Sequence, residues 1–256
     1  MKRSLLISSP LSVAGLFASA AFFVSPDAAA VEFGTKASEH PFRSPQNFQL
    51  ELRLGPYLPQ IDDDPNLHGQ TPFAKNFGSN PRVAVGLEFD WQMFRIPGVG
   101  TIGPGFSVAY VTMGRDVTTV SGRTSGDSTS LSIYPMTAVA VLRADVFWRD
   151  MGIPLVPYGK AGLGLGLWRA SNANGTAVAD NVSGKGASWG TAFALGVSFA
   201  LDSIDKGASR NMDNSTGINN TYVFLEASWL ALNGLAQSNA LHVGTNTWFA
   251  GLAFEF

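Results

Sequence analysis

The stretch TNTWFAGLAFEF, at positions 245–256, alternates between two kinds of side chain. From Trp248 to Phe256 every second residue is apolar, whereas the residues between them are mostly smaller or more polar. A period of two predicts a β-strand with two different faces. The sequence then stops on an aromatic residue, and an open sheet would rarely leave such a strand at its edge. We therefore expect this strand to pair with the first one and to close a membrane barrel.

The composition fits a barrel with small residues inside and lipid outside. Charged residues make up 14% of the 256 residues, below the roughly 25% of ordinary soluble domains. The chain has 28 Gly and 18 Phe, and its formal net charge of -2 indicates no nucleic-acid surface. Cys is absent, which excludes disulfides, thiolate zinc sites and cysteine nucleophiles. A compact β-sandwich has a similar composition, so the strand pattern must decide between the two.

The first 30 residues have the three parts of a secretory signal peptide. Lys2 and Arg3 are positively charged, an apolar stretch covers 11–24, and three alanines at 28–30 form a cleavage site. An uncleaved membrane anchor is the alternative, but Pro10, Ser19 and Ser25 interrupt the wider apolar segment. No later run of about 18 apolar residues follows. The protein is therefore predicted to be exported, and to cross a membrane as strands or not at all.

Seven more segments show the same alternation and are predicted to be strands. In the clearest one Val83, Val85 and Leu87 share one face, and Glu88 and Asp90 share the other. The seven predicted strands cover about 50–55, 82–93, 102–114, 131–148, 160–167, 189–201 and 221–229. With the last strand they make eight, and single-chain bacterial barrels have an even number. We therefore divide the chain into a signal peptide (1–30), a flexible lead-in (31–47) and an outer-membrane β-barrel (48–256).

The connections between the predicted strands alternate in length. Polar loops at 56–80, 115–129 and 171–186 are long, whereas the turns at 97–100 and 149–154 are short. Long extracellular loops and short periplasmic turns are typical of outer-membrane barrels. The sixth connection is an exception, because Asp202 or Ser203 is predicted to cap one short helix that ends near Met212. The seventh connection, at about 233–239, is a short extracellular loop.

Aromatic residues near the ends of the predicted strands suggest girdles at the two membrane interfaces. The alternative is the general preference of aromatic residues for strands. The residues in question are Trp91, Phe94, Tyr110, Tyr134, Trp148, Tyr158, Trp168, Trp189, Tyr222 and Trp248.

Charged residues lie on the faces that are predicted to point inward, with acids and bases roughly matched. An eight-stranded barrel is just wide enough to be filled by side chains, so charges inside it must be paired. We expect a salt-bridge network that plugs the lumen; a narrow or gated pore, in which the pairs open, would use the same residues. The predicted lumen charge network is Glu51, Arg53, Glu88, Asp90, Arg143, Asp145, Lys160 and Glu226.

Three further motifs have stronger structural than catalytic explanations. His242 and Ser238 are the residues that a lipid-modifying barrel enzyme would use, but no supporting acid is evident. Three aspartates at 62–64 lack the ligand spacing of a dedicated calcium site. Alternating glycines at 162–166 have the wrong spacing for a phosphate loop, and we expect them to make room for larger side chains in the lumen. No catalytic, metal or cofactor site is predicted.

The sequence LRLGPYLPQID at 52–62, the pairs Pro72-Phe73 and Phe77-Gly78, and the ending GLAFEF resemble a family of small outer-membrane β-barrel proteins from myxobacteria and their relatives. The resemblance implies an eight-stranded barrel like that of outer membrane protein A, and it carries over no catalytic or binding residues. The ending also resembles the signal by which bacterial barrels are recognised for assembly. The residues of this expected signal are Trp248, Leu252, Phe254 and Phe256.

Together these features predict an all-β protein, an eight-stranded antiparallel transmembrane barrel in the outer membrane of a Gram-negative bacterium. Its expected role is non-enzymatic, as a structural or surface-exposed protein. Its expected partners are outer-membrane lipids, lipopolysaccharide and the barrel-assembly machinery, without nucleic acid, and it is expected to be a monomer without a cofactor. The alternatives are a narrow pore for small solutes, a lipid-modifying enzyme, and a soluble periplasmic barrel that binds an apolar ligand.

Overall fold

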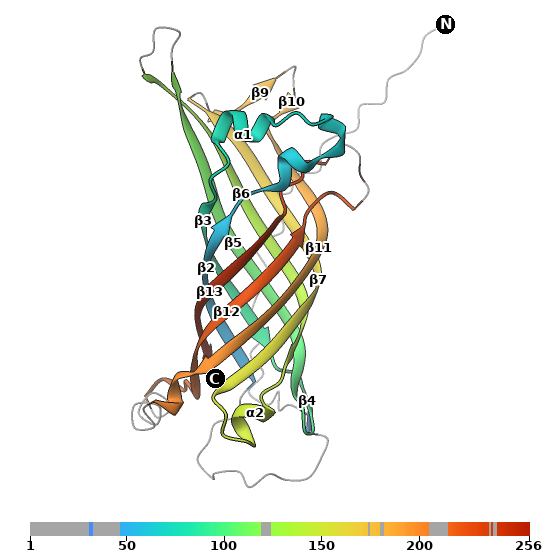
Figure 1. The fold of residues 1–256 in the computed structure, drawn as a ribbon, viewed down its shortest axis with the longest axis vertical. Coiled ribbons are helices and arrows are strands. Elements are labelled where there is room, and N and C mark those ends of the chain that lie inside the picture. The colour runs from blue at the N-terminus through green and yellow to red at the C-terminus, as the bar shows by residue number, and fades with distance from the viewer. Residues whose placement is uncertain are drawn as a thin grey trace, which may run out of the picture.

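Eight long antiparallel strands form a closed barrel (Figure 1). The computed structural model describes residues 31–32, 47–118, 124–173, 175–179, 182–204, 215–235, 237 and 240–256. Each barrel strand pairs with the next along the chain, and β13 pairs with β2 to close the ring. The prediction of an eight-stranded antiparallel barrel is confirmed. The barrel strands are β2 (Phe48–Tyr57), β3 (Arg82–Trp91), β5 (Gly100–Thr118), β6 (Thr124–Arg143), β7 (Leu155–Asn172), β11 (Lys185–Ala200), β12 (Asn220–Ala231) and β13 (Thr245–Glu255).

The two faces of each strand meet different surroundings, as the alternation predicts. In β13, Phe249, Ala253 and Glu255 point inward and are buried, whereas Trp248 and Leu252 point outward and are 52% and 39% exposed. The same division holds in β3, where Val83, Val85 and Leu87 are exposed and Glu88 and Asp90 are buried. The assignment of apolar residues to the outside and charges to the inside is therefore confirmed.

The connections gather at two opposite ends of the barrel, called upper and lower here as they are drawn in Figure 1. The upper end carries η2 (Gln60–Asp63), η3 (Pro65–Leu67), α1 (Pro72–Phe77), β8 (Gly175–Thr176), β9 (Val178–Ala179) and β10 (Val182–Ser183). The lower end carries β4 (Phe94–Ile96), α2 (Val146–Arg149), η4 (Leu201–Ser203) and Phe256. No helix in the described ranges is both long enough and apolar enough to cross a membrane.

The prediction that the fourth strand reaches residue 148 is wrong, because the strand ends earlier. β6 ends at Arg143, and residues 146–149 form α2. The neighbouring strand β5 begins at Gly100, so β6 has no strand partner on that side beyond the pair formed by Arg143 and Thr101. The chain therefore turns, although its apolar alternation continues to Trp148.

The predicted polar loops at 115–129 and 171–186 are largely strands. β5 and β6 extend to Thr118 and from Thr124, and β7 and β11 extend to Asn172 and from Lys185. The sequence there is polar on both faces, so the period of two in hydrophobicity disappears while the backbone ladder continues. Hydrogen bonds between the strands extend these hairpins, and polarity alone did not indicate where they end.

The sixth connection and the amino-terminal segment are described only in part. The sixth connection contains the short helix η4 at 201–203, but its N-cap is Ala200, so the prediction that Asp202 or Ser203 caps the helix is wrong because both residues lie inside it. Residues 205–214, where the helix was expected to continue, lie outside the described residues. Short helices also occur in the first and fourth connections, where none was expected. The predicted signal peptide lies outside the described residues. Of the lead-in, Asn47 and β1 (Val31–Glu32) are described, and β1 pairs in parallel with β4.

Three residues that were assigned to interfacial girdles point into the barrel instead. Tyr158 and Tyr222 are 4% and 1% exposed, and Trp168 packs against the buried core. All three occupy inward positions of β7 or β12, so strand parity outweighs the aromatic side chain. On the outside, Phe48 stacks on Phe89 and Trp91 with ring centroids 5.4 and 6.3 Å apart.

Candidate functional site

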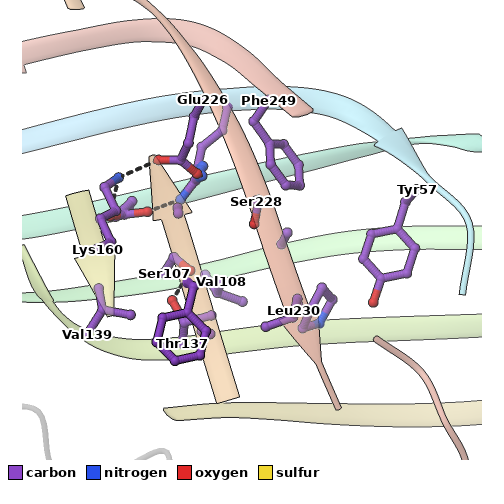
Figure 2. A pocket seen from close by; sticks show the side chains of 17 residues that line it. Tyr57, Ser107, Val108, Thr137, Val139, Lys160, Glu226, Ser228, Leu230 and Phe249 are labelled. Atoms are coloured by element: carbon purple, nitrogen blue, oxygen red, sulfur yellow. Dashed lines mark hydrogen bonds and ion pairs between the residues drawn. The ribbon is translucent and has the colours of Figure 1, made fainter. Parts of the chain in front are cut away.

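A layer of five buried charges crosses the middle of the lumen. Arg53 of β2 forms ion pairs with Glu88 of β3 and Glu226 of β12. Lys160 of β7 lies 3.0 Å from Glu51, 2.6 Å from Glu88 and 3.0 Å from Glu226. Figure 2 shows Lys160 and Glu226 facing each other across the lumen. These two cations and three carboxylates, which together come from four strands, form one network. We call this network the charged layer.

Each partner in the charged layer depends on the others. Arg53, Lys160 and the three glutamates all have side chains that are at most 8% exposed. A buried ion pair gains little over well-packed apolar residues, but removal of one partner leaves an uncompensated charge that costs several kcal/mol. Separation of these buried ion pairs is therefore costly in free energy.

A second polar network lies below the charged layer and centres on Glu255. One carboxylate oxygen of Glu255 accepts from Gln92 Nε2 at 2.6 Å, and the other accepts from Asn220 Nδ2 at 2.7 Å and Tyr222 Oη at 2.9 Å. These bonds tie β13 to β12 and to the chain after β3. Glu255 was not among the predicted lumen charges, although its place on the inward face of the quoted stretch 245–256 was a sufficient signal.

Arg143 and Asp90 lie in this lower part of the lumen without ion-pair partners among the described residues. The guanidinium carbon of Arg143 is 5.8 Å from the centre of the Tyr158 ring and 5.4 Å from that of Tyr222. Both terminal nitrogens of Arg143 and both carboxylate oxygens of Asp90 are buried and have no hydrogen-bond partner. Arg143 is thus held by two aromatic rings, whose faces attract cations.

Asp145 is the member of the predicted network that the structure places elsewhere. It lies after β6, as the residue before α2, and its Oδ2 accepts from Arg95 Nη1 of β4 at 2.8 Å. The reason is the early end of β6, because the chain has left the strand before it reaches Asp145. This ion pair joins two lower connections and does not belong to the charged layer.

Above the charged layer the interior is apolar. Its largest buried side chains include Val111, Met113, Ile133 and Leu232. A cavity of about 50 Å³ separates this region from the charged layer, and Lys160 and Glu226 lie on one side of it (Figure 2). A water molecule needs about 10–15 Å³ of such volume, so the cavity has room for a few waters but not for a solute.

Glycines of β7 make room for this apolar region. A Cβ on Gly164 would lie 2.6 Å from Leu232, and one on Gly166 would lie 2.4 Å from Val243. The expectation that the alternating glycines accommodate larger side chains in the lumen is confirmed for Gly164 and Gly166, whereas a Cβ on Gly162 would meet the backbone of β6.

The first connection covers the upper mouth of the barrel. Ile61 and Phe73 are buried there, and Gln60 donates its backbone N–H to Gly244 at 2.9 Å. Asp62 accepts hydrogen bonds from the backbone N–H groups of Phe73 at 2.7 Å and Ala74 at 2.8 Å, so it caps α1. The aspartates at 62–64, which lack the ligand spacing of a calcium site, therefore include a residue that holds this cover in place.

The other singled-out residues lie apart from the charged layer. His242 belongs to the segment before β13, and Ser238 is outside the described residues. The residues of the expected assembly signal share the outward side of the last strand and the residue after it: Trp248, Leu252, Phe254 and Phe256.

The geometry defines a class of protein: a closed eight-stranded antiparallel barrel with a charged and apolar interior and an apolar exterior. Solved structures of the same class include OprG from Pseudomonas aeruginosa, with 13% identity, 82% of this chain and 96% of that chain covered, and a TM-score of 0.44. Ail, the attachment invasion locus protein of Yersinia pestis, has 13% identity, covers 82% and 97%, and has a TM-score of 0.39. Neisserial surface protein A has 15% identity, covers 82% and 96%, and has a TM-score of 0.39.

These likenesses concern the fold alone. No protein-family model matches the sequence, and no curated protein matches it. The resemblance to the myxobacterial barrel family therefore stays a prediction.

Proposed function

We propose that this chain is an integral outer-membrane barrel protein of a Gram-negative bacterium, with a structural or surface-exposed role and no catalytic activity. One observation carries the proposal: every barrel strand presents large apolar side chains outward, while a network of charged side chains is buried inside. A water-soluble protein rarely exposes a continuous apolar surface of this extent. Lipid is the surrounding in which such a surface is stable, and a closed barrel leaves no unpaired strand edge there.

The apolar exterior encircles the barrel. The most exposed residues include Val83 of β3 at 69% and Leu195 of β11 at 63%. A soluble periplasmic barrel for an apolar ligand would need its apolar faces inside and its charged faces outside, the opposite of the observed orientation. The exposed outward residues on the eight strands include Leu54, Val83, Val85, Phe106, Val108, Tyr134, Leu142, Leu155, Leu163, Phe193, Leu195, Val223, Leu225, Trp229, Trp248 and Leu252.

Two outward-facing cations support our placement of one membrane surface at the upper end of the barrel. They also support a contact with lipopolysaccharide there. Arg169 of β7 and Lys185 of β11 are register partners at the upper ends of their strands, and both are exposed. The outward positions below them on these two strands are uncharged. Cations at this level suit the phosphates of lipid headgroups. We therefore assign the upper end to the outside of the cell and the lower end to the periplasm.

We further propose that the lumen is closed and that the protein is a monomer. The charged layer, the apolar region above it and the cover made by the first connection lie one above the other along the same lumen. The barrel-assembly machinery would engage β13, the strand that closes the ring on β2, through the predicted signal of Trp248, Leu252, Phe254 and Phe256. Export through a signal peptide at 1–30 is part of the same proposal.

The test is a membrane extraction followed by gel electrophoresis. The protein should stay with membranes washed in urea, and unboiled samples should migrate faster than boiled ones because a closed barrel resists unfolding in detergent. A variant with arginine in the apolar wall, Leu225→Arg, should reduce the folded fraction, since a cation at the bilayer midplane costs about 2–4 kcal/mol. Recovery of the protein in the soluble fraction, without a heat shift, would refute the proposal.

A further inference from the structure

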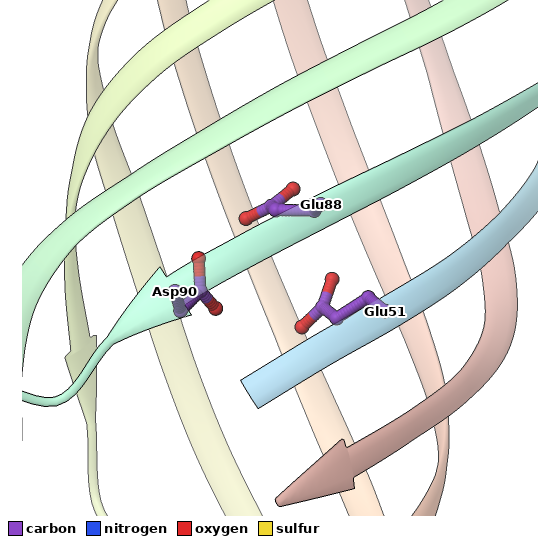
Figure 3. A group of neighbouring side chains, drawn as sticks. All are labelled: Glu51, Glu88 and Asp90. Atoms are coloured by element: carbon purple, nitrogen blue, oxygen red, sulfur yellow. The ribbon is translucent and has the colours of Figure 1, made fainter. Parts of the chain in front are cut away.

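Three carboxylates meet at one point on the inner faces of β2 and β3 (Figure 3). Glu51 and Glu88 are register partners, and Asp90 follows two residues later on β3. One oxygen from each carboxylate lies within 4.8 Å of those from the other two. The three residues are 0%, 1% and 1% exposed. Because like charges directly opposite each other destabilise a sheet, this cluster requires positive charge beside it.

The positive charge that the charged layer supplies reaches only two of the three carboxylates. Lys160 lies 3.0 Å from Glu51 and 2.6 Å from Glu88, and Arg53 also pairs with Glu88. Neither oxygen of Asp90 has a hydrogen-bond partner, and no ion pair reaches it from any described residue. Asp90 thus points into the cluster as a buried carboxylate without a direct hydrogen-bond or ion-pair partner among the described residues.

The charges in the lumen are also unequal in number. Apart from Asp145, which pairs with Arg95, the buried acids and bases described inside the barrel leave two negative charges in excess. The acids are Glu51, Glu88, Asp90, Glu226 and Glu255, and the bases are Arg53, Arg143 and Lys160. An uncompensated buried charge is strongly unfavourable, and one divalent cation would balance this count.

A fourth oxygen beside the cluster lacks a partner. Gln49 is the register partner of Asp90 and is 0% exposed. Its Nε2 donates to Glu51 at 2.7 Å, which fixes the amide next to the cluster, while its Oε1 has no hydrogen-bond partner. The site therefore offers three carboxylates and one amide oxygen, a donor set that hard cations prefer.

We propose that Glu51, Glu88 and Asp90, with Gln49 Oε1, bind one Ca²⁺ inside the barrel. Calcium binds oxygen at about 2.3–2.6 Å, so two oxygens on the same ion are at most about 5 Å apart. The carboxylate oxygens meet this condition. Lys160 holds one side of the glutamates, and the Ca²⁺ joins them to Asp90 on the other.

The binding experiment uses the whole protein, purified from membranes, unfolded in urea with EDTA and refolded into detergent micelles. Titration with CaCl₂ in a calorimeter should show one Ca²⁺ per chain. Asp90→Asn should weaken the affinity at least tenfold. Asp145→Asn, a buried aspartate paired elsewhere, and Asp63→Asn, in an exposed connection, should leave it unchanged. A comparison of boiled and unboiled gel samples first establishes that each variant has folded.

A second readout separates binding from a purely structural role of Asp90. In EDTA, Asp90→Asn should unfold at a higher temperature than the original protein, because it removes part of the charge excess. In CaCl₂ the order should reverse, since only the original protein gains stability from the bound ion. The proposal is overturned if the original protein takes up no Ca²⁺, or if Asp90→Asn binds it equally well. Neither result affects the proposed membrane location.

Discussion

Arg53 is one of the two cations that hold the charged layer together. Its guanidinium pairs with Glu88 of the neighbouring strand β3 and with Glu226 of β12, which lies beyond β13 on the other side of β2. It also lies over the ring of Phe249, 4.9 Å from the centre. Among the described residues, Lys160 is the one other cation that pairs with both Glu88 and Glu226. Loss of Arg53 therefore leaves one cation for three carboxylates.

Replacement of Arg53 by methionine should lower the free energy of unfolding by about 3–5 kcal/mol, the usual cost of breaking a buried ion pair. Urea titration in detergent micelles, followed on unboiled gels, measures the change. Addition of Glu88→Gln to the same chain should recover part of the loss. Arg149→Gln is a suitable control, because Arg149 pairs with Asp150 at the surface and such pairs contribute at most about 1 kcal/mol. An equal midpoint for Arg53→Met and the original protein would contradict the account of the charged layer.

At the scale of the elements, the two opposite faces of β7 have different surroundings. Its outward Leu163 faces the exterior, whereas its inward glycines lie under the side chains of Leu230, Leu232 and Val243. Next to β7 the apolar region of the lumen is thus filled by Leu230 of β12, Leu232 just after it and Val243 before β13, and the glycines of β7 provide the space.

A methyl group on this inner surface should overpack the lumen. Gly166→Ala should lower the free energy of unfolding by about 1–3 kcal/mol, because its Cβ would lie 2.4 Å from Val243 and 2.9 Å from Leu232. Gly114→Ala on β5 is the matched control. Nothing lies within 4 Å of a Cβ there, so stability should stay the same or rise slightly. Similar losses in both variants would show that the lumen is less tightly filled than the structure indicates.

At the scale of the whole molecule, the interior changes character along the barrel axis. Polar side chains around Glu255 occupy the lower part, the charged layer crosses the middle, and apolar side chains fill the upper part beneath the cover. An ion that crossed the lumen would have to separate buried ion pairs and then pass through an apolar region. Both steps oppose conduction.

The protein should therefore be silent in planar lipid bilayers. Current recordings at moderate voltage should show no channels for the original protein or for Glu88→Gln, because the apolar region remains in both. Steady channels in the original protein, with a conductance that changes in Glu88→Gln, would instead support the alternative of a narrow pore. A general porin added to the same bilayer shows that insertion can be detected.

The sequence by itself determined the strands and the direction of their faces, because a period of two is a local property that each segment carries alone. The sides of Leu52, Leu87 and Glu226 follow from their own neighbours in the chain. The ends of the strands were harder to predict from the sequence. The apolar alternation continues to Trp148, although β6 and its pairing with β5 end at Arg143.

Only the tertiary structure decided which inward charges meet. Arg53 and Glu226 are 173 residues apart in the sequence, and their contact depends on the closure and register of the whole ring. Asp145 shared the alternation of the other charges but left the lumen with the turn before α2, whereas Asp90 stayed inside without a partner. Burial forces charges to pair, but the three-dimensional path of the chain determines which partners come within reach.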